Sequence, residues 1–151
     1  MARAIDVARY LIRLASHEEE PDPLTHLRLQ KLLYYVQGWS LAQRGCPMFE
    51  DRIEAWAHGP VVPAVYHTFK DFGFSFIPDN EDPIEGLSEE ESGFIVSVWE
   101  AYKGYSASSL RQMTHDEPTW LDARQGLDPA ERCEAEITHE AMRTFFSSQA
   151  A

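Results

Sequence analysis

The sequence is short of cysteine and of positive charge. Its 151 residues include two cysteines, Cys46 and Cys133, which lie far apart and form no CxxC pair. This usage fits a reducing compartment better than a secreted, disulfide-stapled fold, although one disulfide is compatible with it. There are 13 Lys and Arg against 25 Asp and Glu, which gives a net charge of −12. Because an acidic surface repels phosphate groups, we expect neither nucleic acid nor an anionic membrane as partner.

Long apolar runs are also absent. No stretch is long enough to cross a bilayer, and the apolar residues near the start are interrupted by Asp6, Arg9 and Arg13. We therefore predict no signal-peptide core and expect a cytoplasmic protein. The length is typical of one domain, here residues 1–151, which can fold without a metal or a disulfide. A basic or mixed protein partner would be attracted to its surface.

Motifs for catalysis and cofactor binding are missing as well. The stretch HEAMR at His139 begins like a zinc-hydrolase motif, but Arg143 stands where a second histidine is required. No GxSxG, GxGxxG or GxxxxGK[ST] segment occurs, and neither cysteine has the setting of a nucleophile. We predict no enzyme, cofactor or metal. One alternative is a small metal-dependent hydrolase in which His58, His67 and His115 converge, although their spacing is not a metal signature.

What is present is mainly helical patterning. Apolar residues recur at helical spacing, and a capping box marks one helix start, with Glu91 three positions after Ser88. The DPAE stretch from Asp128 is a further capping signal. The period changes to two at 53–57, which predicts a strand, and FSFIP at 74–78 is a second strand that would pair with it. The predicted helices cover residues 2–16, 25–44, 63–73, 88–104, short segments from 106 and from 118, and 138–148. This indicates a mainly α fold with minor β: one compact domain of about six to seven helices with a small element of two or three strands.

The stretch EAWAHGPVVPAVYHTF, residues 54–69, forms a stiff corner between the first strand and the next helix. Gly59 permits a sharp turn, Pro60 is expected to end strand pairing, and Pro63 suits the first position of a helix. Two interpretations remain: a tight connection with a hydrogen-bonded histidine, or a pre-ordered aromatic edge for a protein partner, since Trp and Tyr are enriched at binding hot spots. The candidate partner-binding residues are Glu54, Trp56, His58, Pro60 and Tyr66, with Lys70 at the rim.

Motifs in several separate segments resemble the SocA-like, or Panacea, antitoxin family. The LQKLLYYxQGW-type helix corresponds to Leu29–Trp39, the P(L)F segment to Pro47–Phe49, and the IEAWxxGPVxPxVY corner to Ile53–Tyr66. Further matches are the lysine- and glycine-containing helix end at 70–73, and the LxxxTHxExPW feature at 110–120, which is followed by an Ala-Arg pair. The sequence departs from the pattern in one place, because Thr119 separates the Pro and Trp that are adjacent in the family. The resemblance covers residues 3–146.

This resemblance implies an antitoxin of a toxin–antitoxin system, of a family often found on phages and mobile elements. Such proteins neutralise a protein toxin by direct contact, and some act as adaptors that present it to a cytoplasmic protease of the AAA+ class. The acidic balance leaves another alternative open. In that alternative the carboxylates imitate the phosphates of a nucleic acid and occupy a DNA-binding protein.

Overall fold

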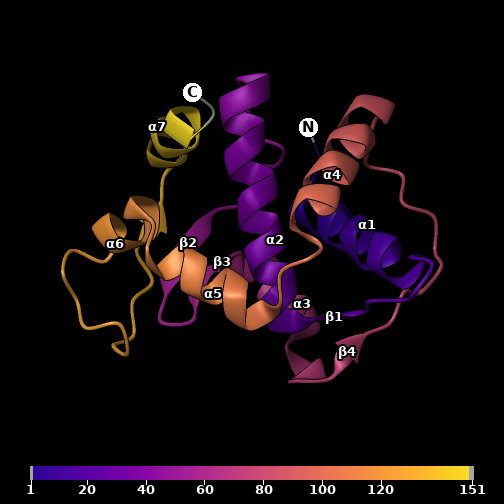
Figure 1. The fold of residues 1–151 in the computed structure, drawn as a ribbon, viewed down its shortest axis with the longest axis horizontal. Helices are drawn as coiled ribbons and strands as arrows, with labels where there is room; N and C mark the ends of the chain where they lie inside the picture. The colour runs from indigo at the N-terminus through magenta and orange to yellow at the C-terminus, as the bar shows by residue number, and fades with distance from the viewer. Residues whose placement is uncertain (1, 150–151) are drawn as a thin grey trace.

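The computed structural model describes residues 2–149 and has a mainly helical fold. Within that range it contains seven α-helices and two small antiparallel sheets (Figure 1). The predicted fold class, mainly α with a minor β element, is therefore confirmed. No helix among these residues is both long and apolar enough to cross a membrane.

Helix α2 (His26–Trp39) runs through the middle of the molecule, with other helices on both sides (Figure 1). Twelve of its 14 residues are buried, which explains the apolar character of the sequence here. Its start is fixed by Thr25, whose side chain accepts a hydrogen bond from the backbone N–H of Arg28. The chain continues as a π-helix from Ser40 to Arg44 and stops at Gly45, where φ is +76°. The predicted helix 25–44 is thus present, with a wider last turn.

The other helices pack around α2, and most begin where the sequence predicts. The capping box at Ser88 forms as expected, with both reciprocal hydrogen bonds in place. The predicted capping signal at Asp128 was wrong, because no helix follows. Asp128 Oδ1 instead accepts from the N–H of Ala130, and its carbonyl oxygen is taken by Arg124, so the chain makes a single turn. The helices are α1 (Ala4–Ser16), α3 (Pro63–Phe69, continued by a 3₁₀ turn Lys70–Phe72), α4 (Glu89–Tyr102), α5 (Ala107–His115), α6 (Pro118–Ala123) and α7 (His139–Gln149).

The strands form a different pattern from the one predicted. Strand β2 (Ile53–Trp56) exists, but its neighbours are β3 (Gly59–Val61) and β5 (Glu136–Ile137), in the order β3-β2-β5. Pro60 does not end the pairing: it stands opposite Ala55 inside β3. Proline is tolerated there because β3 is an edge strand.

The FSFIP segment also pairs differently. Its strand β4 (Phe76–Ile77) pairs with β1 (Leu24–Thr25) and not with β2. This pairing places Leu24 opposite Ile77, and both side chains are fully buried, so the apolar core selects this partner.

Candidate functional site

Polar side chains of α2 form hydrogen bonds with the backbone of the corner at residues 54–66. Gln30 Oε1 accepts a hydrogen bond from the backbone N–H of Val62 at 2.8 Å, and Lys31 Nζ donates to the carbonyl of Pro60 at 3.3 Å. Gly59 completes the fit. Its φ is +109°, and a Cβ there would lie 2.7 Å from Cε of Lys31, so a larger residue would be strained and would collide with the lysine. The backbone of the corner is therefore fixed by buried contacts.

Two aromatic side chains stand on the outer side of this corner. The rings of Trp56 and Tyr66 meet edge to face with centroids 4.8 Å apart, a favourable aromatic geometry. Both are half-buried. The indole N–H of Trp56 donates to Glu54 Oε1 at 2.8 Å, and the Glu54 carboxylate forms an ion pair with Arg52 at 2.9 Å. The indole is thus oriented by a neighbour on its own strand.

A pocket of about 430 Å³ lies between the aromatic corner and the loop that joins α6 to β5. One wall comes from the corner and from the start of α3. The other wall comes from residues 130–134 of the loop. The residues that line this pocket, called the corner pocket below, are Trp56, Ala57, His58, Tyr66, His67, Ala130, Arg132, Cys133 and Glu134.

The loop wall is anchored to the sheet by Arg124. Its guanidinium, buried to 2% exposure, donates to the backbone carbonyls of Ala55 at 2.9 Å, Asp128 at 2.7 Å and Glu131 at 2.6 Å. It also lies over the ring of Trp120, 4.8 Å from the centroid. A single side chain therefore ties the loop to strand β2, which the planar, multi-donor guanidinium is suited to do.

Trp120 supports the same corner from α6. Its indole N–H donates to the carbonyl oxygen of Trp56 at 2.8 Å. The imidazole of His115 stacks on its buried ring with centroids 4.1 Å apart and planes 7° from parallel. The corner motif and the LxxxTHxExPW motif are therefore parts of one assembly.

The structure places the six predicted residues in different roles. Trp56, His58 and Tyr66 line the corner pocket, and Glu54 orients Trp56. Pro60 is buried within strand β3 of the hairpin, so it shapes the corner without being accessible. Lys70 is exposed on the turn after α3 and does not line the pocket.

Sequence reasoning missed the loop residues of the pocket, Arg132 and Cys133 among them. Nothing in their local pattern connects them with the corner. The one available signal was the Ala-Arg pair at 123–124, because Arg124 fixes the loop.

The three histidines of the hydrolase alternative do not form one site. His58 and His67 line the corner pocket, whereas His115 is stacked against Trp120 and does not line it. Burial, and then the charges of Lys31 and Arg111, lower the pKa of His58. Positive charge nearby also disfavours a bound cation. Within residues 2–149, no group of three or more potential ligands is placed to hold a metal ion.

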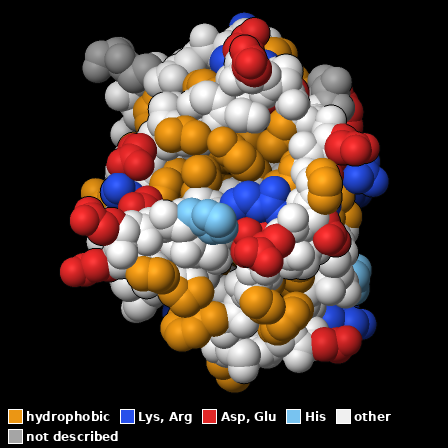
Figure 2. Space-filling view, turned by 90° about the vertical axis from the view of Figure 1, so that its right-hand side faces the viewer, with side chains coloured by type: hydrophobic (Ala, Val, Ile, Leu, Met, Phe, Trp, Pro, Cys, Tyr) orange, Lys and Arg blue, Asp and Glu red, His pale blue; other side chains and the backbone are white. Residues whose placement is uncertain are grey.

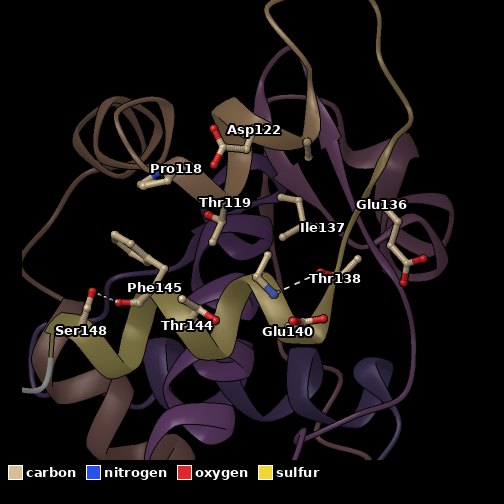
Figure 3. A pocket seen from close by; sticks show the side chains of 12 residues that line it. Pro118, Thr119, Asp122, Glu136, Ile137, Thr138, Glu140, Thr144, Phe145 and Ser148 are labelled. Atoms are coloured by element: carbon tan, nitrogen blue, oxygen red, sulfur yellow. Dashed lines mark hydrogen bonds between the residues drawn. The ribbon is translucent and has the colours of Figure 1, made fainter.

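A second and larger hollow, of about 590 Å³, lies between α6 and α7 and is closed at one end by β5 (Figure 3). Its walls carry the carboxylates of Asp122, Glu136 and Glu140, and apolar surface from Ile137 and Phe145. None of these carboxylates forms an ion pair in the described part of the chain. The hollow has the character of an acidic, partly apolar groove, and none of the predicted site residues lines it.

Comparison with known proteins agrees with the motifs. Residues 29–121 match the family model described as antitoxin SocA-like, Panacea domain. The chain belongs to this family. The match contains α2 from Leu29 onward, the aromatic corner and Trp120, whereas the loop wall of the corner pocket lies outside it.

One relative in the family is Antitoxin SocA of Caulobacter vibrioides (strain NA1000 / CB15N). It is 44% identical to this chain over 68 residues, which is 43% of this chain and 36% of that protein. The match thus spans about a third of the length of the relative. No solved structure is significantly similar to the chain.

Proposed function

We propose that this protein, acting as one unit over residues 1–151, is an antitoxin that neutralises a protein toxin by binding it, without catalysing a reaction. The observation that carries the proposal is the aromatic pair Trp56–Tyr66, which is half-exposed beside the corner pocket and lies within the family match. Large aromatic side chains beside a pocket are typical anchors of protein interfaces.

The rigidity of the corner supports this use. Gln30 and Lys31 hold its backbone, Trp120 holds Trp56, and Arg124 holds the facing loop. A surface that is already ordered loses little conformational freedom when a partner binds, so more of the contact energy appears as affinity. We propose that an apolar side chain of the toxin enters the corner pocket.

The polar rim would add specificity. His58 and His67 offer imidazole nitrogens, while Arg132 and Glu134 form an exposed ion pair of 2.7 Å at the opposite wall. Exposed pairs of this kind contribute little to stability, so they are free to exchange partners across an interface.

The proposal extends to the fate of the complex. On the family resemblance, we propose that binding takes place in the cytoplasm and that the bound toxin can be presented to an AAA+ protease. Sequestration alone and delivery are distinguished by the lifetime of the toxin in cells that contain or lack this antitoxin.

The test is co-expression with the product of the neighbouring reading frame, expected to be toxic alone and tolerated with this protein. Truncation of an anchor costs about 2 kcal/mol or more, so Trp56→Ala should weaken toxin binding about 30-fold in calorimetry. The control Trp56→Phe, which keeps a ring, should lose less. Leu121→Ala, at an exposed position on α6 that does not line the pocket, should bind normally.

Two results would contradict this assignment. An unfolded Trp56→Ala protein by circular dichroism would make Trp56 a residue of the core, and full affinity of a folded variant would place the interface elsewhere. The nucleic-acid mimic makes a different prediction, since its binding should fall steeply with added salt, whereas an aromatic interface should respond weakly.

A further inference from the structure

Three phenylalanines lie on the surface in and just before strand β4, and none of them lines the corner pocket. Phe74 is 90% exposed, Phe76 is 61% exposed and Phe72 is 38% exposed. Figure 2 shows this side of the molecule, with one group of apolar side chains in its upper half and another in its lower part, and with acidic and some basic side chains beside them. A single exposed apolar residue needs no explanation, but a cluster of large ones marks an interaction surface.

The three residues belong to consecutive short elements. Phe72 ends the 3₁₀ turn that follows α3, Phe74 lies in the turn after it, and Phe76 is the first residue of β4. Side chains alternate across a strand, and within β4 Phe76 is exposed whereas the next residue, Ile77, is buried.

Strand β4 also has a free edge. It pairs with β1 on one side, and this sheet has no third strand in the described part of the chain. An exposed strand edge offers unpaired backbone N–H and C=O groups to an added strand. One extended segment of a partner could therefore contact the exposed phenylalanines and pair with the free edge of β4 at the same time.

The charges in the segment that contains these phenylalanines indicate which kind of partner could bind there. Residues 70–85 contain five carboxylates and one cation, Lys70, and Arg9 of α1 donates to Asn80 Oδ1 and to the carbonyl of Asp82 at 3.1 Å. Neither of these two cations forms an ion pair among residues 2–149. Asp79 is paired with Arg13 at 3.0 Å, but the other four form no ion pair among residues 2–149. The cations on the other side of Phe76 are already neutralised, because Arg28 pairs with Asp22 and Lys103 with Glu18 and Glu100. The four unpaired carboxylates are Asp71, Glu81, Asp82 and Glu85.

From these observations we propose a second protein-binding surface, formed by Phe72, Phe74, Phe76 and the free edge of β4. Its occupant is an extended segment of another protein in which apolar residues alternate with Lys or Arg. The segment adds as a strand beside β4, its apolar side chains cover the phenyl rings, and its cations face the unpaired carboxylates. An anionic membrane and a second copy of this acidic chain would both be repelled by the same charges.

The experiment selects peptides from a displayed library of random dodecapeptides on the purified full-length protein. Selections are repeated on the double variant Phe74→Ser/Phe76→Ser and on Leu121→Ser, a matched control whose leucine is 46% exposed on α6. Circular dichroism and melting temperature confirm that each variant is folded, which the exposure of the substituted side chains favours. Selected peptides are then measured by fluorescence anisotropy and by hydrogen exchange of residues 74–77.

We expect enriched peptides with net positive charge and alternating apolar residues. Their affinity should fall at least tenfold for the double variant and stay within twofold for Leu121→Ser and for Trp56→Ala, and they should slow exchange at 74–77. The proposal is overturned if no enriched peptide distinguishes the double variant from the wild type, or if the enriched peptides are acidic. It is equally overturned if Phe74 and Phe76 are needed for binding phosphatidylcholine vesicles or for self-association in sedimentation, and not for peptide binding.

Discussion

The phenol of Tyr35 donates a hydrogen bond of 2.8 Å to Oε2 of Glu117, across 82 residues of sequence. The neighbouring Tyr34 donates to Oε1 of the same carboxylate at 2.7 Å and also meets the hydroxyl of Thr119. The tyrosine pair of the α2 motif and the glutamate of the LxxxTHxExPW motif are therefore two halves of one contact, in which buried phenols meet a half-buried carboxylate. This contact fixes the start of α6, and with it Trp120 beneath the aromatic corner.

The half-buried carboxyl group of Glu117 should make stability depend on pH. Burial raises the pKa of Glu117 above its ordinary value of 4.5, more than the hydrogen bonds from the two tyrosines lower it. The folded state therefore holds this proton to higher pH than the unfolded state, and stability falls as pH rises from 4.5 through the raised value. Glu117→Gln, whose amide has no proton to lose in this range of pH, should lack this dependence. The difference in unfolding free energy between wild type and variant, from urea titrations at pH 4 to 8, should decrease as pH rises; parallel curves would contradict the prediction.

The buried amine of Lys31 should make the free energy of unfolding depend on pH with the opposite sign. Burial, and then the charge of Arg111, lower the pKa of Lys31 from 10.5 to about 7. Between these values the unfolded state binds the proton and the folded state does not, so stability rises with pH across this window. The gain is at most about 5 kcal/mol. Lys31→Met should remove it, and the wild-type-minus-variant difference in unfolding free energy should grow from pH 7 to 9.5. A difference that stays constant would show that the amine keeps its proton in the fold.

The behaviour of Lys31 illustrates what the sequence could predict and what it could not. Apolar periodicity and capping residues predicted most helices, because those signals are local. The same reasoning cannot see why polar residues on α2 are buried. Gln30, Lys31 and Gln37 satisfy backbone groups of segments that lie 11 to 32 residues further on, and those partners are defined only by the fold.

The strands and the pocket also combine features that local sequence predicts with features that depend on long-range packing. A period of two predicted β2, but its partners β3 and β5 depend on long-range packing, and so does the pairing of β4 with β1. Three residues of the aromatic corner were predicted to be accessible partners and do line a pocket. The opposite wall was missed, because it is brought there by one arginine whose hydrogen-bonding partners are backbone carbonyls.

Arg124 should therefore control the order of the loop that forms that wall. In Arg124→Lys the ammonium cannot reproduce the planar set of donors that reaches Ala55, Asp128 and Glu131 together. We expect faster amide exchange over residues 125–135 in hydrogen-exchange mass spectrometry, with α1 and α2 unchanged. The matched control is Arg143→Lys, at an exposed position on α7, which should exchange like the wild type. An unaltered loop in Arg124→Lys would mean that the turn at Asp128 is ordered without the guanidinium.

Gly38 allows α7 to approach α2 closely. Replacing a glycine in a helix with alanine usually stabilises a protein, but at this position the added methyl group should destabilise it. A Cβ at Gly38 would stand 2.1 Å from Cε2 of Phe146, a core residue with 1% exposure. Overpacking of this kind costs about 1–3 kcal/mol, more than the roughly 1 kcal/mol gained from helix propensity. Gly38→Ala should thus unfold at lower urea concentration than the wild type.

The control for Gly38 is Gly93, an exposed glycine of α4 with nothing within 4 Å of an added Cβ. Gly93→Ala should stabilise the protein by about 0.5–1 kcal/mol, since only the conformational gain remains. The double variant Gly38→Ala/Phe146→Leu should recover part of the loss, because the smaller side chain makes room for the methyl group, and a double-mutant cycle measures that coupling. If Gly38→Ala and Gly93→Ala are equally stabilising, α7 can shift without cost, and the close approach of the two helices is not what keeps a glycine at position 38.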